Sequence, residues 1–159
     1  MRVVVTGATG NVGTSVLRAL ASDPRVEEIV GVARRLPQWR NPRTRWVAAD
    51  VVTSALEPVF EGADAVIHLA WLIQPSHDAR ALRAVNVEGS RRVFEAAVRA
   101  GAGVLVHASS VGVYSPGPKD RRVDETWPSG AARRAARAGR RPRCAAAPSR
   151  APHARARCP

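Results

Sequence analysis

The sequence contains only two cysteines and no long apolar run, and both features exclude whole classes of protein. Cys144 and Cys158 both lie near the C-terminus, so neither a disulfide framework nor a zinc site can be built around the rest of the chain. No segment approaches the roughly 18 apolar residues of a membrane span. The strand-like start at residues 2–6 also lacks the apolar core of a signal peptide. We therefore expect a cytoplasmic protein with reduced thiols, no metal site and no membrane segment.

Acidic residues are absent from the last part of the chain. Residues 1–128 hold 16 basic and 13 acidic residues, whereas residues 129–159 hold nine arginines and no acid, so the net charge of +12 mainly describes the tail. After Pro128 there is no Val, Ile, Leu, Met or aromatic residue. Such a segment buries too little apolar surface to offset the conformational entropy that it would lose on folding. We predict a folded domain over 1–128 and a disordered, Ala/Arg/Pro-rich tail over 129–159. The high pI is then no reason to regard the whole protein as a nucleic-acid binder.

The first 110 residues alternate between short apolar runs and segments with helical spacing. Such alternation indicates a parallel sheet with right-handed crossovers, here an incomplete doubly wound α/β sheet of about five strands. The run at 2–6 is apolar throughout, which is typical of a strand buried on both faces. Gly101 is suited to end the second helix. The predicted strands are 2–6, 26–33, 44–50, 63–71 and 103–110, and the predicted helices are 11–22 and 77–100.

The segment "TGATGNVG" places three glycines between the first strand and the first helix. Gly7 permits a tight turn, Gly10 lets a pyrophosphate approach the backbone, and Gly13 lets the helix pack closely on the strand. The helix N-terminus would offer N–H groups and a positive dipole end to phosphates. This pattern predicts a Rossmann-like dinucleotide site, and the alternative is a glycine-rich turn without a ligand.

The end of the second strand reads Ala33-Arg34-Arg35. An acidic residue there would accept a hydrogen bond from the ribose 2′-hydroxyl of NAD, but this chain has two guanidinium groups instead. Arginine binds phosphate with two parallel hydrogen bonds, so a 2′-phosphate is the better-matched ligand. The sequence thus favours NADP over NAD, unless both arginines are only solvated loop charges.

Five ordered motifs, "TGATGNVG", "AADV", "HLAW", "NVEGS" and "SSVGVY", resemble the extended short-chain dehydrogenase/reductase family, also called the NAD(P)-dependent epimerase/dehydratase family. The resemblance covers about residues 1–128. It implies hydride transfer between a nicotinamide and a secondary alcohol or ketone, commonly on a nucleotide sugar. The glycine turn, Arg34 and the resemblance together give the candidate cofactor-binding residues, which are Gly7, Thr9, Gly10, Asn11, Val12, Gly13, Arg34, Asp50, Val51, Leu69, Ala70, Trp71, Asn86 and Ser109.

Several of these residues also allow a purely structural interpretation. Asp50 and Val51 would line the adenine pocket, although Asp50 could instead cap a helix starting near Thr53. Trp71 either covers the nicotinamide side of the site or packs in the core. Asn86 would anchor backbone or a water near the catalytic residues, and the alternative is a surface amide.

Two histidines and two serines are further candidates for chemistry. His68 lies inside a predicted buried strand, so we interpret it as a core residue rather than a general base, and His107 likewise. The family resemblance makes Ser110 the catalytic serine and puts Ser109 nearer the nicotinamide. Either serine could instead cap a turn at a strand end.

The family's proton-transferring pair, Tyr-x-x-x-Lys on one helix, is missing. The one tyrosine and the one lysine, Tyr114 and Lys119, are five residues apart with two prolines between them, so no helix can join them. Tyr114 matches the family's turn tyrosine rather than its catalytic one. We therefore predict dinucleotide binding without turnover. The small-molecule substrate would be used only by intact relatives.

The composition of the tail suggests a gene read out of frame near residues 129–130, because GC-rich codons out of frame give alanine, arginine, proline and glycine. The alternative is a genuine basic tail that binds nucleic acid or acidic lipid, although no aromatic residues or periodic basic face support specific nucleic-acid recognition. A non-catalytic NADP-binding sensor is a further alternative. The sequence leaves a homodimer open, and the loss of later elements of the fold argues against one.

Overall fold

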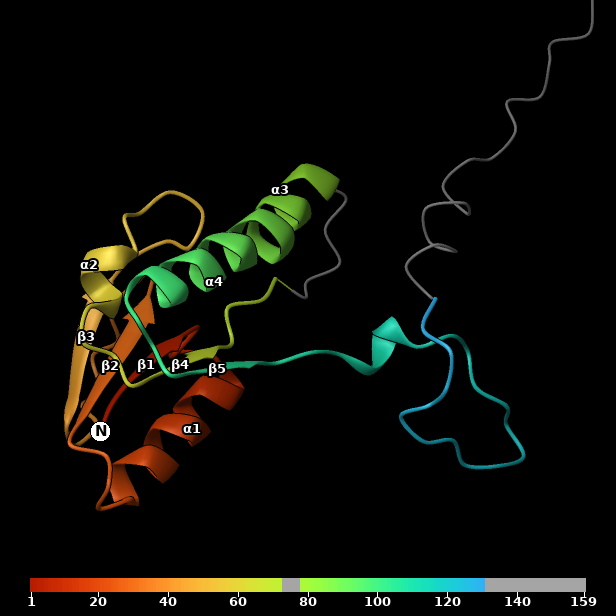
Figure 1. Ribbon diagram of the computed structural model, residues 1–159, viewed down its shortest axis with the longest axis horizontal. Coiled ribbons are helices and arrows are strands. Elements are labelled where there is room, and N and C mark those ends of the chain that lie inside the picture. The colour runs from red at the N-terminus through yellow and green to blue at the C-terminus, as the bar shows by residue number, and fades with distance from the viewer. Residues whose placement is uncertain (73–77, 131–159) are drawn as a thin grey trace, which may run out of the picture. The chain divides into compact units, whose positions relative to one another are not determined.

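The computed structural model describes residues 1–72 and 78–130, and the chain divides into two units, Met1–Ala108 and Ser109–Pro159. The first unit is built on a parallel five-stranded sheet with the strand order β3-β2-β1-β4-β5 (Figure 1), which confirms the predicted Rossmann-like α/β fold. The strands are β1 (Arg2–Thr6), β2 (Glu28–Ala33), β3 (Thr44–Ala48), β4 (Ala65–His68) and β5 (Val104–His107). The helices are α1 (Asn11–Ser22), α2 (Glu57–Phe60), α3 (Ala79–Arg83) and α4 (Ser90–Arg99), with a π-helical segment, η1 (Ala84–Gly89), joining α3 to α4.

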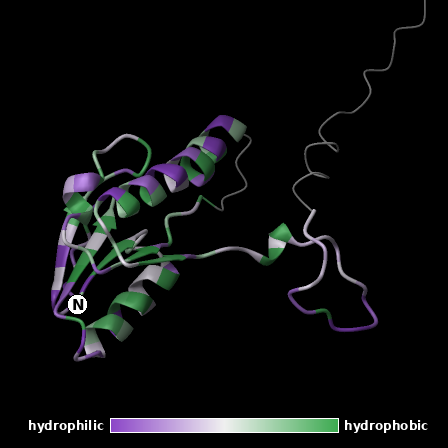
Figure 2. Cartoon of the chain, in the orientation of Figure 1, coloured by the Kyte–Doolittle hydropathy of each residue, from purple (hydrophilic) through white to green (hydrophobic). Residues whose placement is uncertain are grey.

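Helices cover both faces of the sheet (Figure 1), and the alternation of side chains along β1 shows why. Val4 belongs to the core beneath α4, where Val93 is fully buried. Val3 and Val5 belong to the core on the opposite face, where Leu17 of α1 is fully buried. An uninterrupted apolar strand is stable only when both faces are covered, so the predicted two-sided burial of β1 is confirmed. Figure 2 shows the same pattern as hydrophobic strands between helices banded with hydrophilic and hydrophobic residues.

The predicted boundaries agree at both ends for β1, predicted at 2–6, and for α1, predicted at 11–22. The later strands are shorter than predicted, and β4 ends at His68 instead of running on to residue 71. The following residues are therefore free to form a loop at the end of the sheet. The short helix α2 was not predicted. Gly101 ends the long helix as expected, with a φ of 72° and its N–H donating to the carbonyl oxygen of Val98.

The strand β5 corrects one expectation, because all four of its residues are exposed in the described part of the chain. Val104, Leu105 and Val106 are 52, 39 and 49% exposed. His107 was predicted to be a core histidine like His68, but it is exposed on this strand. The physical reason is that β5 stands at the edge of the sheet that the described residues form, where it pairs with β4 alone.

In the second unit, the two ends of a loop over residues 114–129 are joined by hydrogen bonds. Tyr114 forms an antiparallel bridge with Ser129, and the backbone N–H of Ser115 donates to the carbonyl oxygen of Pro128 at 2.8 Å. The indole N–H of Trp127 also donates to the carbonyl oxygen of Ser115, at 3.1 Å. The predicted disordered tail lies outside the described residues from residue 131 onward, and the predicted boundary at residue 128 stays a prediction.

Candidate dinucleotide site

A pocket of about 220 Å³ lies at the carboxyl ends of the strands. Crossovers from β1 lead to β2 on one side and, after β3, to β4 on the other, so this is the point where the strand order reverses and where ligands bind in open α/β sheets. The loops after β1, β2, β3 and β4 all contribute to its wall. The lining residues are Gly7, Thr9, Gly10, Val32, Ala33, Arg34, Ala49, Asp50, Val51, Leu69, Ala70, Trp71, Leu72 and Val85.

The turn after β1 is shaped by close backbone contacts. Gly7 has a φ of 72°, and a Cβ atom added to it would lie 2.6 Å from the carbonyl carbon of Leu69. The N–H of Gly10 donates to the carbonyl oxygen of Gly7 at 3.0 Å, which closes the turn. The helix α1 then begins at Asn11, and no side chain caps its first turn in the described chain. The geometry of this turn therefore presents backbone rather than side chains to the pocket, as pyrophosphate binding requires.

Three residues predicted from the same motif, Asn11, Val12 and Gly13, do not line the pocket. Gly13 faces the turn after β1 instead: a Cβ atom there would lie 2.4 Å from the carbonyl oxygen of Gly7. The helix α1 therefore packs at backbone contact on the turn that follows β1, whereas the predicted role of Gly13 in cofactor binding stays a prediction. Val12 is 63% exposed, on the surface of α1.

The loop after β2 brings one of the two predicted arginines to the pocket. Arg34 lines the pocket beside the buried Ala33, and Arg35 does not line it. Asp50 is the one acidic residue among the lining residues. The rim therefore combines one guanidinium from the β2 loop with one carboxylate from the β3 loop.

Asp50 stabilises its own turn. Its Oδ1 accepts the N–H of Val52 at 2.8 Å, and its own N–H donates to Oγ of Ser54 at 2.9 Å. Residues 51–54 form a turn rather than a helix, so Asp50 is not the helix cap considered above. Arg92 of α4 fixes the same turn, since its guanidinium donates to the carbonyl oxygens of Val51 and Ser54.

The residues after β4 form another wall of the pocket. Because β4 ends at His68, Leu69, Ala70 and Trp71 lie in the loop, and all three line the pocket. Trp71 is 46% exposed, so of its two interpretations, packing in the core is wrong. Its placement over the nicotinamide stays a prediction.

Asn86 holds the backbone of this wall with two hydrogen bonds. Its Oδ1 accepts the N–H of Leu72 at 2.8 Å, and its Nδ2 donates to the carbonyl oxygen of Leu72 at 3.0 Å. Asn86 is thus a backbone anchor rather than a surface amide, and it acts on the pocket without lining it. The predicted set of cofactor-binding residues lacks five of the lining residues, Val32, Ala33, Ala49, Leu72 and Val85. Val85 belongs to the apolar positions of the long helix, whereas no sequence signal pointed to Leu72.

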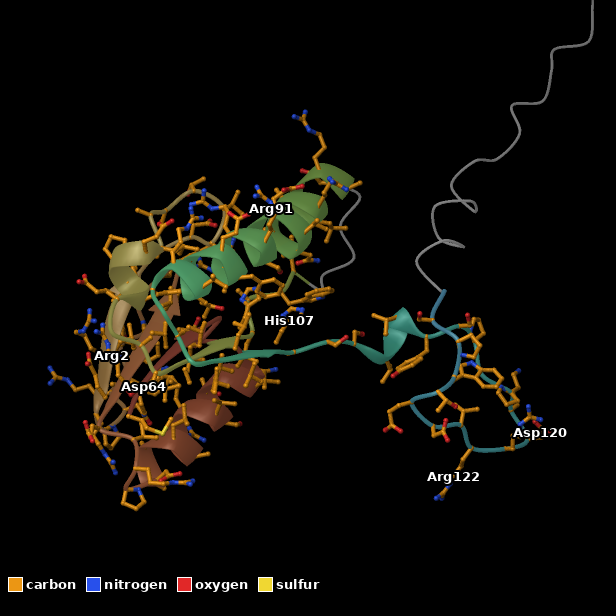
Figure 3. All side chains as sticks on the ribbon, viewed as in Figure 1. Arg2, Asp64, Arg91, His107, Asp120 and Arg122 are labelled. Atoms are coloured by element: carbon orange, nitrogen blue, oxygen red, sulfur yellow. The ribbon has the colours of Figure 1, made fainter. Side chains whose placement is uncertain are left out.

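His68 is a buried histidine, 1% exposed, with both ring nitrogens engaged. Nδ1 lies 2.6 Å from Oγ1 of Thr6, and Nε2 lies 2.9 Å from Oγ of Ser90. Burial first, and then the nearby His107, lower the pKa of His68 from 6.5 to about 4. The two rings stack with centroids 5.2 Å apart, and His107, which Figure 3 labels, also packs edge-to-face against Phe94 of α4. His68 is therefore neutral at physiological pH, consistent with its interpretation as a core residue.

The serines predicted for chemistry belong to the second unit of the chain. Ser110 precedes a 3₁₀ turn, η2 (Val111–Val113), and its Oγ accepts the N–H of Gly112 at 3.1 Å. This contact is the turn-capping role considered above, and Ser109 and Ser110 are both exposed. Their roles at the nicotinamide stay predictions.

The described residues show neither a metal centre nor a membrane span. Over residues 1–72 and 78–130, no group of three or more His, Cys, Asp or Glu side chains is arranged to hold a metal ion. Within the same ranges, none of the helices combines the length and the apolar character needed to cross a bilayer.

Comparison with known proteins agrees with the geometry of the pocket. Residues 3–136 match the NAD dependent epimerase/dehydratase family. The chain is 37% identical over 114 residues to L-arabinose 1-dehydrogenase (NAD(P)(+)) of Haloferax volcanii, a match that covers 71% of this chain and 42% of that enzyme. It is 38% identical over 114 residues to the ceramide reductase of Caulobacter vibrioides, covering 67% of this chain and 34% of the reductase.

Solved structures give the same picture. The crystal structure of uronate dehydrogenase from Agrobacterium tumefaciens superimposes with a TM-score of 0.70 at 25% identity, covering 81% of this chain and 48% of that one. MoeE5 in complex with UDP-glucose and NAD superimposes with a TM-score of 0.70 at 31% identity, covering 87% and 48% of the two chains. This chain therefore spans less than half the length of each of these relatives. On its sequence and its fold, the chain belongs to the NAD-dependent epimerase/dehydratase family.

Proposed function

We propose that this chain binds a nicotinamide dinucleotide in the pocket at the carboxyl ends of its strands, with NADP preferred over NAD. The observation that carries the proposal is that the glycine turn and Arg34 line the same pocket. The turn offers backbone to the pyrophosphate, and Arg34 offers a guanidinium to a 2′-phosphate. Leu69, Ala70 and Trp71 would lie toward the nicotinamide. We expect the protein in the cytoplasm.

The proposal includes the absence of turnover. Oxidising a secondary alcohol sends a hydride to the nicotinamide and a proton to a base, and the family's base is a tyrosine beside a lysine. Tyr114 lies in the bridge with Ser129, and Lys119 is the one lysine of the chain. The sequence contains no Tyr-x-x-x-Lys pair, so the chain would lack the base that takes the proton. It would then bind the cofactor without reacting, as a non-catalytic sensor does. The sugars in the names of its relatives, L-arabinose, uronate and UDP-glucose, suggest the substrate class of an intact enzyme.

The proposal is tested by titrating the chain with NADPH and NADH and following nucleotide fluorescence. We expect saturable binding of both and a lower Kd for NADPH. The matched control is Gly10→Val. Gly10 has φ −74° and ψ 168°, an extended conformation that valine adopts readily, and it lines the pocket. A Cβ atom there would lie 3.3 Å from the carbonyl oxygen of Gly7, a tight contact that a small shift relieves. Gly10→Val should therefore fold and lose binding. If the folded wild-type chain binds neither nucleotide, the proposal is wrong.

A second assay tests the absence of turnover. The chain is incubated with NADPH and a panel of keto sugars and ketones, or with NADP⁺ and aldoses and uronates. We expect the absorbance at the nicotinamide band to stay at the level of a no-protein blank. A protein-dependent change that Gly10→Val abolishes would contradict the proposed lack of catalysis.

We further propose that the sequence after Pro128 is read out of its original frame. Residues 129–159 contain nine arginines and no acidic residue, and their apolar residues are alanine, proline and cysteine. This composition is expected when a GC-rich gene is translated out of frame. The gene is read in all three forward frames beyond codon 128. A second frame that encodes Tyr-x-x-x-Lys within about twenty codons supports the proposal. If no frame does, the tail is genuine, and salt-dependent DNA binding of the full chain becomes the next measurement.

A further inference from the structure

A chain of polar contacts links the core of the sheet to the wall of the pocket. It starts at Thr6 Oγ1, which lies 2.6 Å from Nδ1 of His68, and it continues from Nε2 of His68 to Oγ of Ser90 at 2.9 Å. Ser90 Oγ lies 2.9 Å from the carbonyl oxygen of Asn86, whose side chain holds both backbone polar groups of Leu72. The first three side chains are 0, 1 and 6% exposed, so the chain of contacts runs through the interior.

The direction of these hydrogen bonds follows from the chemistry of their members. The carbonyl oxygen of Asn86 can only accept, so the one hydroxyl proton of Ser90 is donated to it. Ser90 must then accept from His68, which places the ring proton on Nε2. A neutral ring with its proton on Nε2 leaves Nδ1 as an acceptor for the hydroxyl of Thr6. Only this tautomer satisfies all three contacts together.

The helix geometry at this point also departs from an ordinary α-helix. The segment η1 (Ala84–Gly89) is π-helical, and Ser90 follows it directly. Insertions of this kind are rare inside helices and are frequent at functional sites. The hydroxyl of Ser90 donates to the carbonyl oxygen of Asn86, four residues earlier, a contact that is typical where a helix bends. Close packing continues on the other side, where a Cβ atom on Gly89 would lie 2.8 Å from Cγ2 of Val51.

We propose that Ser90 and His68 are positioning residues for the dinucleotide pocket: they fix Asn86, and Asn86 fixes the backbone of Leu72 in the pocket wall. The proposal rests on the proposed function, because its consequence is measured as dinucleotide affinity. Neither residue lines the pocket, so neither would touch the cofactor. Within the described residues, the titratable group acting on His68 is His107, which stacks against it, while Phe94 packs on it edge-to-face.

The proposal is tested with Ser90→Ala, which removes both contacts of the hydroxyl. Two quantities are measured. The first is the hydrogen-exchange rate of the Leu72 amide in the nucleotide-free chain, divided by that of a β1 amide that reports global opening. The second is the Kd for NADPH. We expect the relative exchange rate of Leu72 to rise tenfold or more and the Kd to rise about fivefold.

Two matched variants separate positioning from stability. Val93→Ala lies on the same helix at a fully buried position and leaves the polar contacts intact. It should destabilise the fold while changing both quantities less than twofold. Ser90→Thr keeps a hydroxyl and should retain wild-type values. Both variants are compared with wild type at pH 7.

The outcomes distinguish this inference from the proposed function. Unchanged relative exchange at Leu72 in Ser90→Ala overturns the inference, and so does faster exchange with an unchanged Kd. Equal effects of Val93→Ala and Ser90→Ala would also overturn it, because the role would then be general stability. If wild-type protein binds no NADPH, the proposed function fails, and the positioning of a dinucleotide pocket fails with it, whereas the exchange measurement still reports whether Ser90 holds Leu72.

Discussion

The Cα of Gly13 faces the carbonyl oxygen of Gly7 so closely that a Cβ atom on Gly13 would lie 2.4 Å from that oxygen. The helix α1 and the turn after β1 thus pack at backbone contact. Gly7 itself lines the pocket, so the contact joins the helix to the pocket wall. A methyl group at residue 13 would therefore disturb both the core and the site.

Gly13→Ala is predicted to destabilise the domain by about 1–3 kcal/mol, because the obstacle is backbone that cannot rotate away. Urea unfolding followed by tryptophan fluorescence measures the change. Gly103→Ala is the control, since its Cβ atom would meet its nearest neighbour, the carbonyl oxygen of Asp64, at an ordinary 3.6 Å. Equal midpoints for Gly13→Ala and wild type would contradict the packing described here.

A comparison of Gly7 with Gly101 separates the two destabilising effects of replacing a glycine, backbone strain and steric overlap. Both have a φ of 72°, so alanine at either position adds left-handed strain of about 1–2 kcal/mol. A Cβ atom on Gly101 meets no atom within 4 Å, whereas one on Gly7 would meet the backbone of Leu69 and Ala70 at 2.6–2.7 Å. Gly7→Ala should therefore cost clearly more in the free energy of unfolding than Gly101→Ala, and it alone should weaken NADPH binding. If the two variants prove equally stable, the steric part of this argument is wrong.

Arg34 and Arg35 are adjacent, but only Arg34 lines the pocket. Arg34→Glu should raise the Kd for NADPH at least tenfold and that for NADH much less, because a carboxylate repels a 2′-phosphate and can accept from a 2′-hydroxyl. Arg35→Glu is the matched control for net charge, and its smaller effect should fall with added salt. Fluorescence titration with both nucleotides measures the ratio. An equal loss of NADPH affinity in the two variants would contradict a specific role for Arg34, because the effect would then depend only on net charge.

His68 should make the stability of the domain depend on pH below neutrality. Its pKa is lowered to about 4 in the folded chain from 6.5, chiefly by burial, so the unfolded chain binds the proton more readily between these values. The stabilisation is complete above pH 6.5, decreases as the pH falls toward 4, and amounts to about 2–3 kcal/mol over this window.

The measurement is urea unfolding of wild type and His68→Gln at pH 7, 6, 5 and 4.5. The variant cannot titrate at this position, so its free energy of unfolding should decrease less steeply as the pH falls. His107→Gln, on the exposed strand, keeps the titration of His68 and should keep most of the slope. Parallel profiles for His68→Gln and wild type would show that this histidine does not titrate across the transition.

The sequence alone determined the local elements and the place of the site. Apolar runs and helical spacing predicted the order of strands and helices, and three glycines after a buried strand predicted a turn at the edge of the sheet. These predictions succeed because backbone periodicity and glycine conformations depend on neighbours in the chain. The same local rules placed Arg34, Asp50 and Leu69 at the ends of strands, which a parallel sheet must bring to one edge.

The tertiary structure alone decided what each side chain contacts. His68 and His107 look alike in sequence, at the ends of two apolar strands, yet one is buried and the other exposed because β4 is central and β5 is at the edge. Asn86 finds its partner Leu72 fourteen residues earlier in the chain, a pairing that no periodicity in the sequence predicts. Ser90 binds His68 on a different element. Burial and long-range hydrogen bonds depend on which elements become neighbours in space, and this is decided only when the sheet and its helices pack together.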